Sequence, residues 1–448
     1  MMNRMAELFD LLIRGGTIVS AQGRLNADVG IRGEQIVAVG DLTSSQATKV
    51  IDAIGKVILP GAVDTQVHFR EPGMEHKEDI ESGTRSAICG GVTAIFEMPN
   101  TNPLTISRET LEDKLDRASG RAWCDYAFFV GGCAESVECI EELEMMPGTP
   151  GVKVFMGSST GTLMVEDDAI LKKVMERGKR PMSVHSEDEA RLRERYAALA
   201  PGTHVREHPH VRDPECAVRS TNRLLKLCEE TGRPVHILHI STQEELPIIR
   251  SAKDRGLPVT CEATPHHLTL NSDRYEDLGT FLQMNPPVRS EEHRLALWEG
   301  VKSGLFDVFG SDHAPHTIEE KRKPYPQSPS GMPGVQTIYP MMIHWALSGE
   351  IALETVVQML CERPCSLFGV KNKGFIKPGF DADICLLDAK AKRDVSLDWL
   401  QSKCGWSPYE GMELNGRIDT VILRGNVIVD NGALLGQPSG AMVQFDWK

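Results

Sequence analysis

Short apolar runs alternate with amphipathic stretches along the middle of the chain, and a polar or glycine turn separates most of them. The apolar runs are rich in β-branched residues and short, which is typical of buried strands. They are Val57–His68, Val92–Pro99, Cys124–Gly132, Gly151–Gly157, Arg180–His185, Pro234–Ser241, Leu257–Thr264 and Asp307–Ser311. The stretches with helical spacing are Glu78–Cys89, Arg108–Ala118, Glu135–Met145, Asp167–Arg177, Glu215–Thr231, Glu244–Arg255 and Glu291–Lys302. Glycine follows several of these stretches, as it commonly does at helix C-termini.

This alternation predicts an α/β protein. Strands separated by helices pair in parallel through right-handed crossovers. The count of eight strands favours a closed (β/α)8 TIM-like barrel over an open sheet. No G-x-G-x-x-G motif follows the first strand, which weighs against a dinucleotide-binding fold.

The two ends of the chain have a different pattern. Residues 9–52 and 374–435 consist of short β runs separated by Gly, Asn and Asp turns, which indicates antiparallel structure. We expect both ends to meet in one small β-sandwich beside the barrel; the alternative is two separate β appendages. The expected division is 1–54 for the first part of the sandwich, 55–370 for the barrel and 371–448 for the second part.

Composition narrows the classes of partner. The 448 residues carry 49 basic and 63 acidic side chains, a net charge of −14, which argues against nucleic-acid binding through bulk charge. A local pocket can still bind a small anion. No apolar run approaches the roughly 18 residues of a membrane span, and a secretory signal is not expected. Eleven cysteines without a C-x-x-C pair fit a reducing cytoplasm. We therefore expect a cytoplasmic protein with a small-molecule substrate.

Metal-ligand residue types gather at the ends of the predicted strands. In a barrel of this kind, catalytic groups lie at the C-terminal ends of the strands. Three histidines, an aspartate and a lysine occupy such positions: His68, Lys153, His185, His239 and Asp312. Imidazole and carboxylate ligands with open coordination positions suit zinc, or a similar divalent ion, in hydrolysis.

Lys153 does not fit this set as an ordinary lysine, because an ammonium beside a dication is electrostatically unfavourable. Two interpretations remain open. The side chain points away from the site, or carbon dioxide has carbamylated it into an anionic ligand.

Several motifs together resemble a known family. The sequence is similar to the amidohydrolase superfamily and, within it, to class I dihydroorotases. The similarity covers nearly the whole chain in the family's order. The motifs are DTQVHFREPG (64–73), GGVTAIFEMPNTNP (90–103), GVKVFMGSSTG (151–161), HSED (185–188), LHIST (238–242), CEATPHHLTL (261–270), NPPVR (285–289), GSDHAPH (310–316), GMPGVQT (331–337) and SPYEG (407–411).

This resemblance implies a site and a reaction. It implies one or two zinc ions at the barrel mouth, bound by His68, Lys153 as a bridging carboxylysine, His185, His239 and Asp312. Asp312 would also serve as general base and then as general acid. The implied reaction is the reversible, zinc-dependent cyclisation of N-carbamoyl-L-aspartate to L-dihydroorotate in pyrimidine biosynthesis.

The resemblance also implies contacts to the substrate carboxylate. Arg70 has the planar fork that suits a carboxylate, and Asn100 and His316 match the family's other carboxylate contacts. Asn285 matches a contact to the ring. Allantoinases usually have Asn at the position of Arg70, and hydantoinases lack FREPG. Those enzymes are the nearest alternatives, as another kind of cyclic amidohydrolase.

The family pattern is broken at Gln66, where the first-strand His-x-His motif has its first histidine. Three interpretations stay open. One metal position is weak or empty, Gln66 ligates through its amide oxygen, or the chain is a poorly catalytic homologue. A non-catalytic homologue would bind a partner such as aspartate transcarbamoylase. A homodimer is expected by resemblance only.

Overall fold

Eight parallel strands form a closed barrel in the middle of the chain. The structure, a computed structural model, describes residues 8–158 and 163–447. One barrel strand is interrupted at Phe129, so it carries two labels, β8 and β9. The ring closes beyond β14, where the amide of His68 donates to the carbonyl of His313 over 2.7 Å. The strands are β6 (Ala62–Val67), β7 (Val92–Glu97), β8 (Asp125–Phe128), β9 (Val130–Gly131), β10 (Val152–Phe155), β11 (Met182–His185), β12 (Val235–Ile237), β13 (Val259–Ala263) and β14 (Val308–Phe309).

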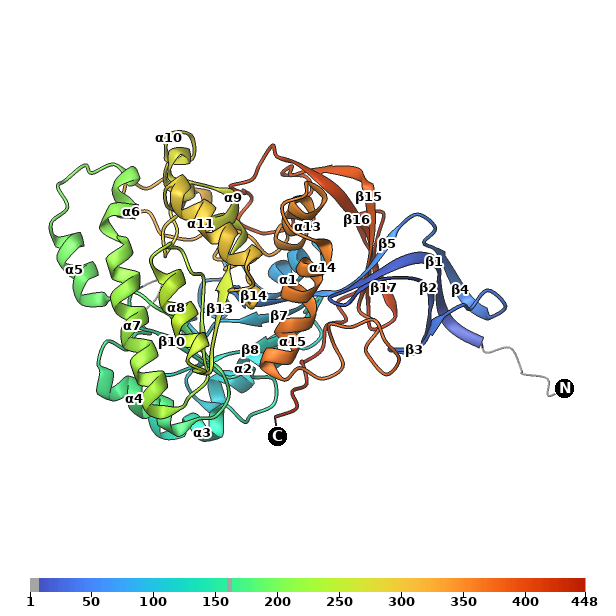
Figure 1. Cartoon of the computed structure of the whole chain (residues 1–448), viewed down its shortest axis with the longest axis horizontal. Helices are drawn as coiled ribbons and strands as arrows, with labels where there is room; N and C mark the ends of the chain where they lie inside the picture. Colours follow the sequence, from blue (N-terminus) through green and yellow to red (C-terminus); the bar gives the residue numbers. More distant parts are fainter. Residues whose placement is uncertain (1–7, 159–162, 448) are drawn as a thin grey trace.

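Helices cover the outside of this barrel (Figure 1). The predicted (β/α)8 fold is confirmed, and two helices have the predicted bounds. The larger helices are α1 (Ile80–Cys89), α2 (Arg108–Ala118), α4 (Asp168–Arg177), α5 (Glu189–Ala197), α7 (Pro214–Thr231), α8 (Glu245–Asp254), α11 (Glu291–Lys302), α13 (Ile338–Leu347), α14 (Leu353–Val357), the π-helical η5 (Gln358–Glu362) and α15 (Arg363–Phe368). Within the described ranges, no helix is both long and apolar enough to span a membrane.

Short helical turns interrupt the loops. They are η1 (Val137–Cys139), α3 (Ile140–Leu143), η2 (Val205–Glu207), α6 (His208–Val211), α9 (Pro265–Thr269), η3 (Ser272–Arg274), α10 (Tyr275–Leu278), η4 (Gly279–Leu282) and α12 (Ile318–Lys321). The predicted helix Glu135–Met145 is reduced to η1 and α3. Local sequence fixes the longer helices at both ends. Ser107 caps α2 through a capping box with Thr110, and Asp213 caps α7, which ends at Gly232 with a φ of 69°.

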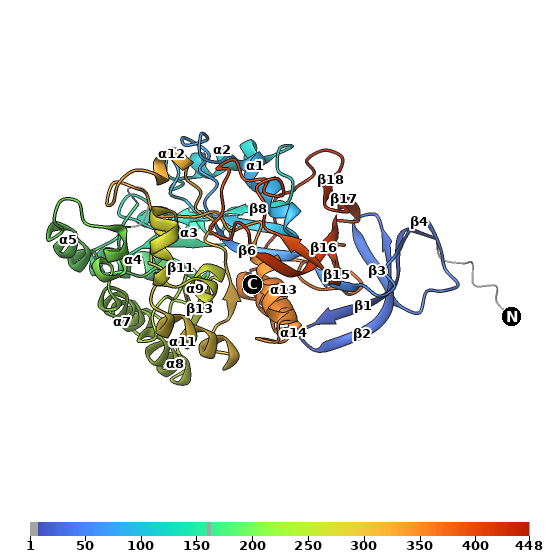
Figure 2. The same ribbon diagram turned by 90° about the horizontal axis from the view of Figure 1, so that it is seen from above.

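Both ends of the chain enter one second sheet, in which β5 pairs antiparallel with β15. The predicted sandwich beside the barrel is therefore confirmed, and two separate appendages are excluded (Figure 2). Apolar side chains of both ends share one core, including Ile13, Val29, Ile384 and Ile422. The strands are β1 (Leu8–Ser20), β2 (Gly23–Arg32), β3 (Gln35–Gly40), β4 (Gln46–Asp52), β5 (Val57–Pro60), β15 (Ile384–Asp394), β16 (Glu413–Leu423), β17 (Asn426–Asp430) and β18 (Ala433–Leu434).

The run Val57–His68 is two strands, and the prediction of a single strand was wrong. β5 belongs to the second sheet and β6 to the barrel. The chain passes between them at Pro60 and Gly61. A Cβ at Gly61 would lie 2.2 Å from the Oγ1 of Thr93, so only glycine fits the close packing at this crossing. Continuous hydrophobicity hid the boundary, because both strands are buried.

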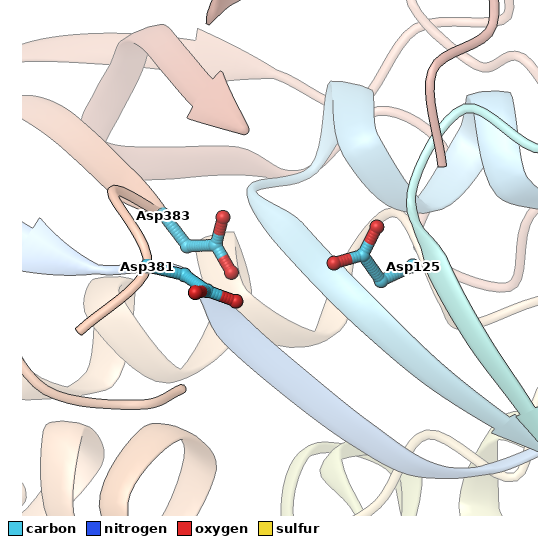
Figure 3. Close-up of side chains that lie close together, drawn as sticks. All are labelled: Asp125, Asp381 and Asp383. Carbon is cyan, nitrogen blue, oxygen red and sulfur yellow. The ribbon is translucent and has the colours of Figure 1, made fainter. Parts of the chain in front are cut away.

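An ion-pair cluster joins the barrel to the second sheet. Asp125 begins β8, and its carboxylate faces those of Asp381 and Asp383, which lie just before β15 (Figure 3). Three close carboxylates resemble a metal site in outline. The Nζ of Lys373 lies 2.5, 3.0 and 2.7 Å from Asp125, Asp381 and Asp383 and supplies the positive charge instead. Arg424 also contacts Asp125. The cluster therefore serves as a structural joint.

We expect Lys373→Met to lower the free energy of unfolding by about 3–5 kcal/mol, because it leaves buried carboxylates without their cation. Urea denaturation measures this change. The exposed Lys371→Met is the matched control and should change stability by less than about 0.5 kcal/mol. Equal stability of the two variants would contradict the structural role of this ion-pair cluster.

Candidate functional site

Three predicted site residues have an unusual backbone conformation. Arg70, His239 and Asp312 have φ values of 66°, 39° and 47°. They follow the C-terminal ends of β6, β12 and β14. Non-glycine residues rarely adopt positive φ, and strained residues cluster at functional sites. The backbone conformation therefore indicates a functional site at this end of the barrel, independently of which side chains lie there.

Lys153 stands at the centre of this end of the barrel. It lies on β10, is fully buried, and its Nζ has no hydrogen-bond partner. Burial lowers the pKa of Lys153 to about 7. Its charge acts on the pKa of each of the other four predicted ligands, namely His68, His185, His239 and Asp312. The other four predicted ligands thus lie near enough to Lys153 for its charge to act on them.

His185 and His239 form the first pair of predicted ligands. The Nδ1 of His185 lies 3.0 Å from the Nε2 of His239. The Nε2 of His185 lies 3.0 Å from the carboxylate of Glu187, and this close negative charge favours the proton on Nε2. Nδ1 of His185 then accepts a hydrogen bond from the Nε2–H of His239. A carboxylate that fixes a ligand's tautomer in this way is typical of metal-bound histidines.

Glu187 is itself held by Arg212. The Nε of Arg212 lies 3.2 Å from both carboxylate oxygens, and its Nη2 lies 2.5 Å from one of them. Burial opposes the charge of Glu187, yet Arg212 and His185 hold its pKa well below the usual range. Glu187 therefore stays an acceptor for His185 at neutral pH.

His68, Asp312 and Gln66 form the second group. The Nε2 of His68 and the Nε2 of Gln66 lie 3.3 and 2.9 Å from the same oxygen of Asp312. The Nδ1 of His68 donates to the Oδ1 of Asn100 over 2.8 Å, which orients the ring. The Oε1 of Gln66 is buried without a hydrogen-bond partner.

These residues suit a divalent cation. Lys153 Nζ and Gln66 Oε1 are buried polar atoms with no hydrogen-bond partner, and such atoms are costly unless something else binds them. Two adjacent imidazole nitrogens and a carboxylate are ligands that zinc prefers. The expected ligands form two groups about Lys153 rather than one compact cluster.

The predicted carboxylate contacts lie beside the second group. The Nη2 of Arg70 lies 3.3 Å from the Nε2 of His316, and the Nε of Arg70 donates to the carbonyl of Pro315. Both side chains are 2% exposed. Trp406, from the segment between β15 and β16, donates to the carbonyl of His316 over 2.8 Å. The segment that connects β15 and β16 of the second sheet thus holds His316 through this hydrogen bond.

Asn285 belongs to a different set of contacts. Its Oδ1 lies 3.1 Å from the Nε2 of His208, which is fully buried. The Nδ1 of His208 lies 3.3 Å from the hydroxyl of Tyr325. The structure therefore places Asn285 next to His208 and does not record a contact with Arg70 or His316.

Sequence reasoning missed Glu187, Arg212, His208 and Lys77. Only Glu187 had a local signal, because it lies two residues after His185 in the HSED motif. His208 begins α6 and Arg212 directly follows α6, and nothing in their local sequence shows that they contact the site.

The chain matches known proteins over most of its length. The sequence model of the Amidohydrolase family matches residues 57–428. A protein named dihydroorotase from Halobacterium salinarum is 37% identical over 397 residues, 88% of this chain and 91% of the relative. A protein named allantoinase from Salmonella newport is 32% identical over 434 residues, 94% of this chain and 95% of the relative.

A solved structure has nearly the same fold. It is an L-hydantoinase (dihydropyrimidinase) from Arthrobacter aurescens, with a TM-score of 0.93 and 29% identity. The match covers 97% of this chain and 100% of that one. The relatives thus carry the names of several different cyclic amidases.

We expect Glu187→Gln to weaken zinc affinity about 10–100-fold, because the amide cannot hold His185 in its ligating tautomer as a carboxylate does. Competition with a chromophoric chelator measures this affinity. Glu194→Gln, an exposed change of the same type on α5, is the control and should leave affinity unchanged. Unchanged affinity in Glu187→Gln would contradict the orienting role.

Proposed function

The chain belongs to the amidohydrolase family, and from that premise we propose that it is a metal-dependent hydrolase of cyclic amides, specifically a dihydroorotase. The observation that supports this substrate is the pair Arg70 and His316 at the barrel mouth. Dihydroorotate carries a carboxylate, which allantoin and hydantoins lack. A buried guanidinium is a strong recognition group for that carboxylate. Relatives named dihydroorotase at 33–37% identity agree with the proposal.

Zinc would be held by His185 and His239 with Lys153, and by His68 and Asp312. When bound, it lowers the pKa of its water and polarises the substrate carbonyl. Lys153 would take part as a carbamate. Because burial lowers its pKa to about 7, a large share of the side chain is neutral amine near pH 7. The amine nitrogen adds to the carbon of CO2 and loses one proton, which leaves an anionic ligand.

Asp312 is the proposed proton carrier. Burial raises its pKa to about 7 in the metal-free chain, although Lys153, His185 and Arg70 act in the opposite direction. A group with a pKa near the working pH both accepts and returns a proton effectively. In the hydrolytic direction its carboxylate takes the proton of the attacking oxygen and delivers it to the leaving ring nitrogen. The amide of Gln66 donates to the carboxylate and holds it in place for both transfers.

Gln66 favours one metal position over two. Its amide nitrogen already donates to Asp312, and only its amide oxygen faces the site without a partner. An amide oxygen is a weaker zinc ligand than an imidazole. We propose a mononuclear centre near His185 and His239 and a weak position near His68. Asp312 and Arg70 are both present, which argues against a non-catalytic homologue, because only a catalytic protein needs them.

A homodimer and an association with aspartate transcarbamoylase stay predictions.

A substrate panel tests the proposed function. Zinc-loaded protein prepared with bicarbonate should turn over dihydroorotate with a kcat/KM on the order of 10⁴-fold above that for allantoin, hydantoin or dihydrouracil. Allantoin, hydantoin and dihydrouracil carry no carboxylate, so they would leave Arg70 and His316 unpaired. Asp312→Ala should lower kcat for dihydroorotate by about 10²–10⁴-fold while the fold stays intact. Preference for an uncharged substrate would identify a different cyclic amidase.

Metal content tests the proposed role of Gln66. We expect about one zinc per wild-type chain and about two in Gln66→His, because the new imidazole completes the weak position. Mass spectrometry of the metal in dialysed protein gives the count. Gln336→His is the control, since Gln336 is also buried but bonds to Ser86 and Trp399. Two zincs in the wild type would contradict the mononuclear centre.

A further inference from the structure

Lys77 contacts the predicted carboxylate pocket, and the proposed reaction does not account for it. It lies between β6 and α1, and its side chain is 13% exposed. The Nζ of Lys77 lies 3.2 Å from the Nδ1 of His316 and 3.1 Å from the carboxylate of Glu320. Lys77 thus contacts His316 from the side opposite to Arg70.

The hydrogen bonds of His316 determine where its proton lies. Its Nε2 lies 3.0 Å from the carbonyl oxygen of Ser330. A carbonyl only accepts, so Nε2 carries the proton. An ammonium only donates, so Lys77 donates to the lone pair of Nδ1. Burial and the nearby Arg70 keep the pKa of His316 well below its usual value, which agrees with a neutral ring.

This tautomer places two donors side by side. The Nε2–H of His316, which donates to Ser330 until a substrate competes for it, and the Nη2 of Arg70 are 3.3 Å apart and cannot bond to each other. Two adjacent donors suit a shared acceptor, and a carboxylate accepts from both. The donor at Nε2 exists only while the proton stays there.

Glu320 would draw the proton to the other nitrogen. Its second oxygen lies 3.6 Å from Nδ1 of His316. Without Lys77, that carboxylate favours an Nδ1–H tautomer, and Nε2 becomes an acceptor that faces Arg70. Glu320 would also be left as a negative charge near the pocket, where it repels an anionic substrate. Lys77 opposes both effects.

We propose that Lys77 is a specificity-determining positioning residue, which holds His316 as an Nε2–H donor and so selects substrates that carry a carboxylate. The inference rests on the proposed function, because it assumes an anionic cyclic amide as substrate. It predicts that Lys77 affects recognition of the carboxylate and leaves the chemistry at the ring amide unchanged.

Lys77→Met tests the proposal on the zinc-loaded full chain. We expect KM for dihydroorotate to rise about 10–100-fold, the effect of losing one charge-assisted hydrogen bond. kcat should stay within about twofold of the wild type. Activity on dihydrouracil, which has no carboxylate, should not fall. Lys77→Arg keeps a donor and a charge and should restore most of the affinity. The exposed Lys323→Met is the matched control and should behave as the wild type.

Binding of orotate, measured by calorimetry, separates the two proposals. If the wild type neither binds orotate nor turns over dihydroorotate, the proposed function fails. If the wild type does both and Lys77→Met binds orotate equally well, the role of Lys77 is wrong. An equal fold loss of kcat/KM for dihydroorotate and dihydrouracil in Lys77→Met would also overturn the role of Lys77. A general structural defect would affect both substrates in this way.

Discussion

The burial of Lys153 without a hydrogen-bond partner is the constraint on which the rest of the site depends. An isolated ammonium in a protein interior is strongly unfavourable, so its proton affinity falls or a counter-group must be supplied. Here burial lowers the pKa to about 7. The surrounding histidines are also held below their usual pKa by burial. The barrel mouth is therefore a set of neutral donors of lone pairs, which is the state that metal binding requires.

Three histidines in this site are each oriented by a polar partner. Glu187 fixes His185, Asn100 fixes His68, and Lys77 fixes His316. Arg212 and Glu320 in turn balance the charges of Glu187 and Lys77. The barrel brings the strand ends together, while the loops set tautomer and orientation. This division explains why folds of one kind carry different cyclic amidase activities.

The barrel was predictable from sequence because the signals are local. Hydrophobic runs with helical stretches between them identified the strands, and the ligand types stand at the strand ends. The break between β5 and β6 was hidden, since both strands are buried and apolar. Lys77 and Arg212 were also hidden. Each acts through a residue distant in sequence, at separations of 239 residues for Lys77 with His316 and 25 for Arg212 with Glu187, and no pattern marks such a pairing.

The proposed zinc centre beside a carbamylated Lys153 is tested most directly by a crystal structure of zinc-loaded protein, with anomalous diffraction recorded at the zinc edge. We expect a zinc peak bounded by Nδ1 of His185, Nε2 of His239 and the end of Lys153, with added density on Nζ for a carbamate. A zinc peak among Asp125, Asp381 and Asp383, or an unmodified Lys153 with no metal beside it, would contradict the proposed zinc centre.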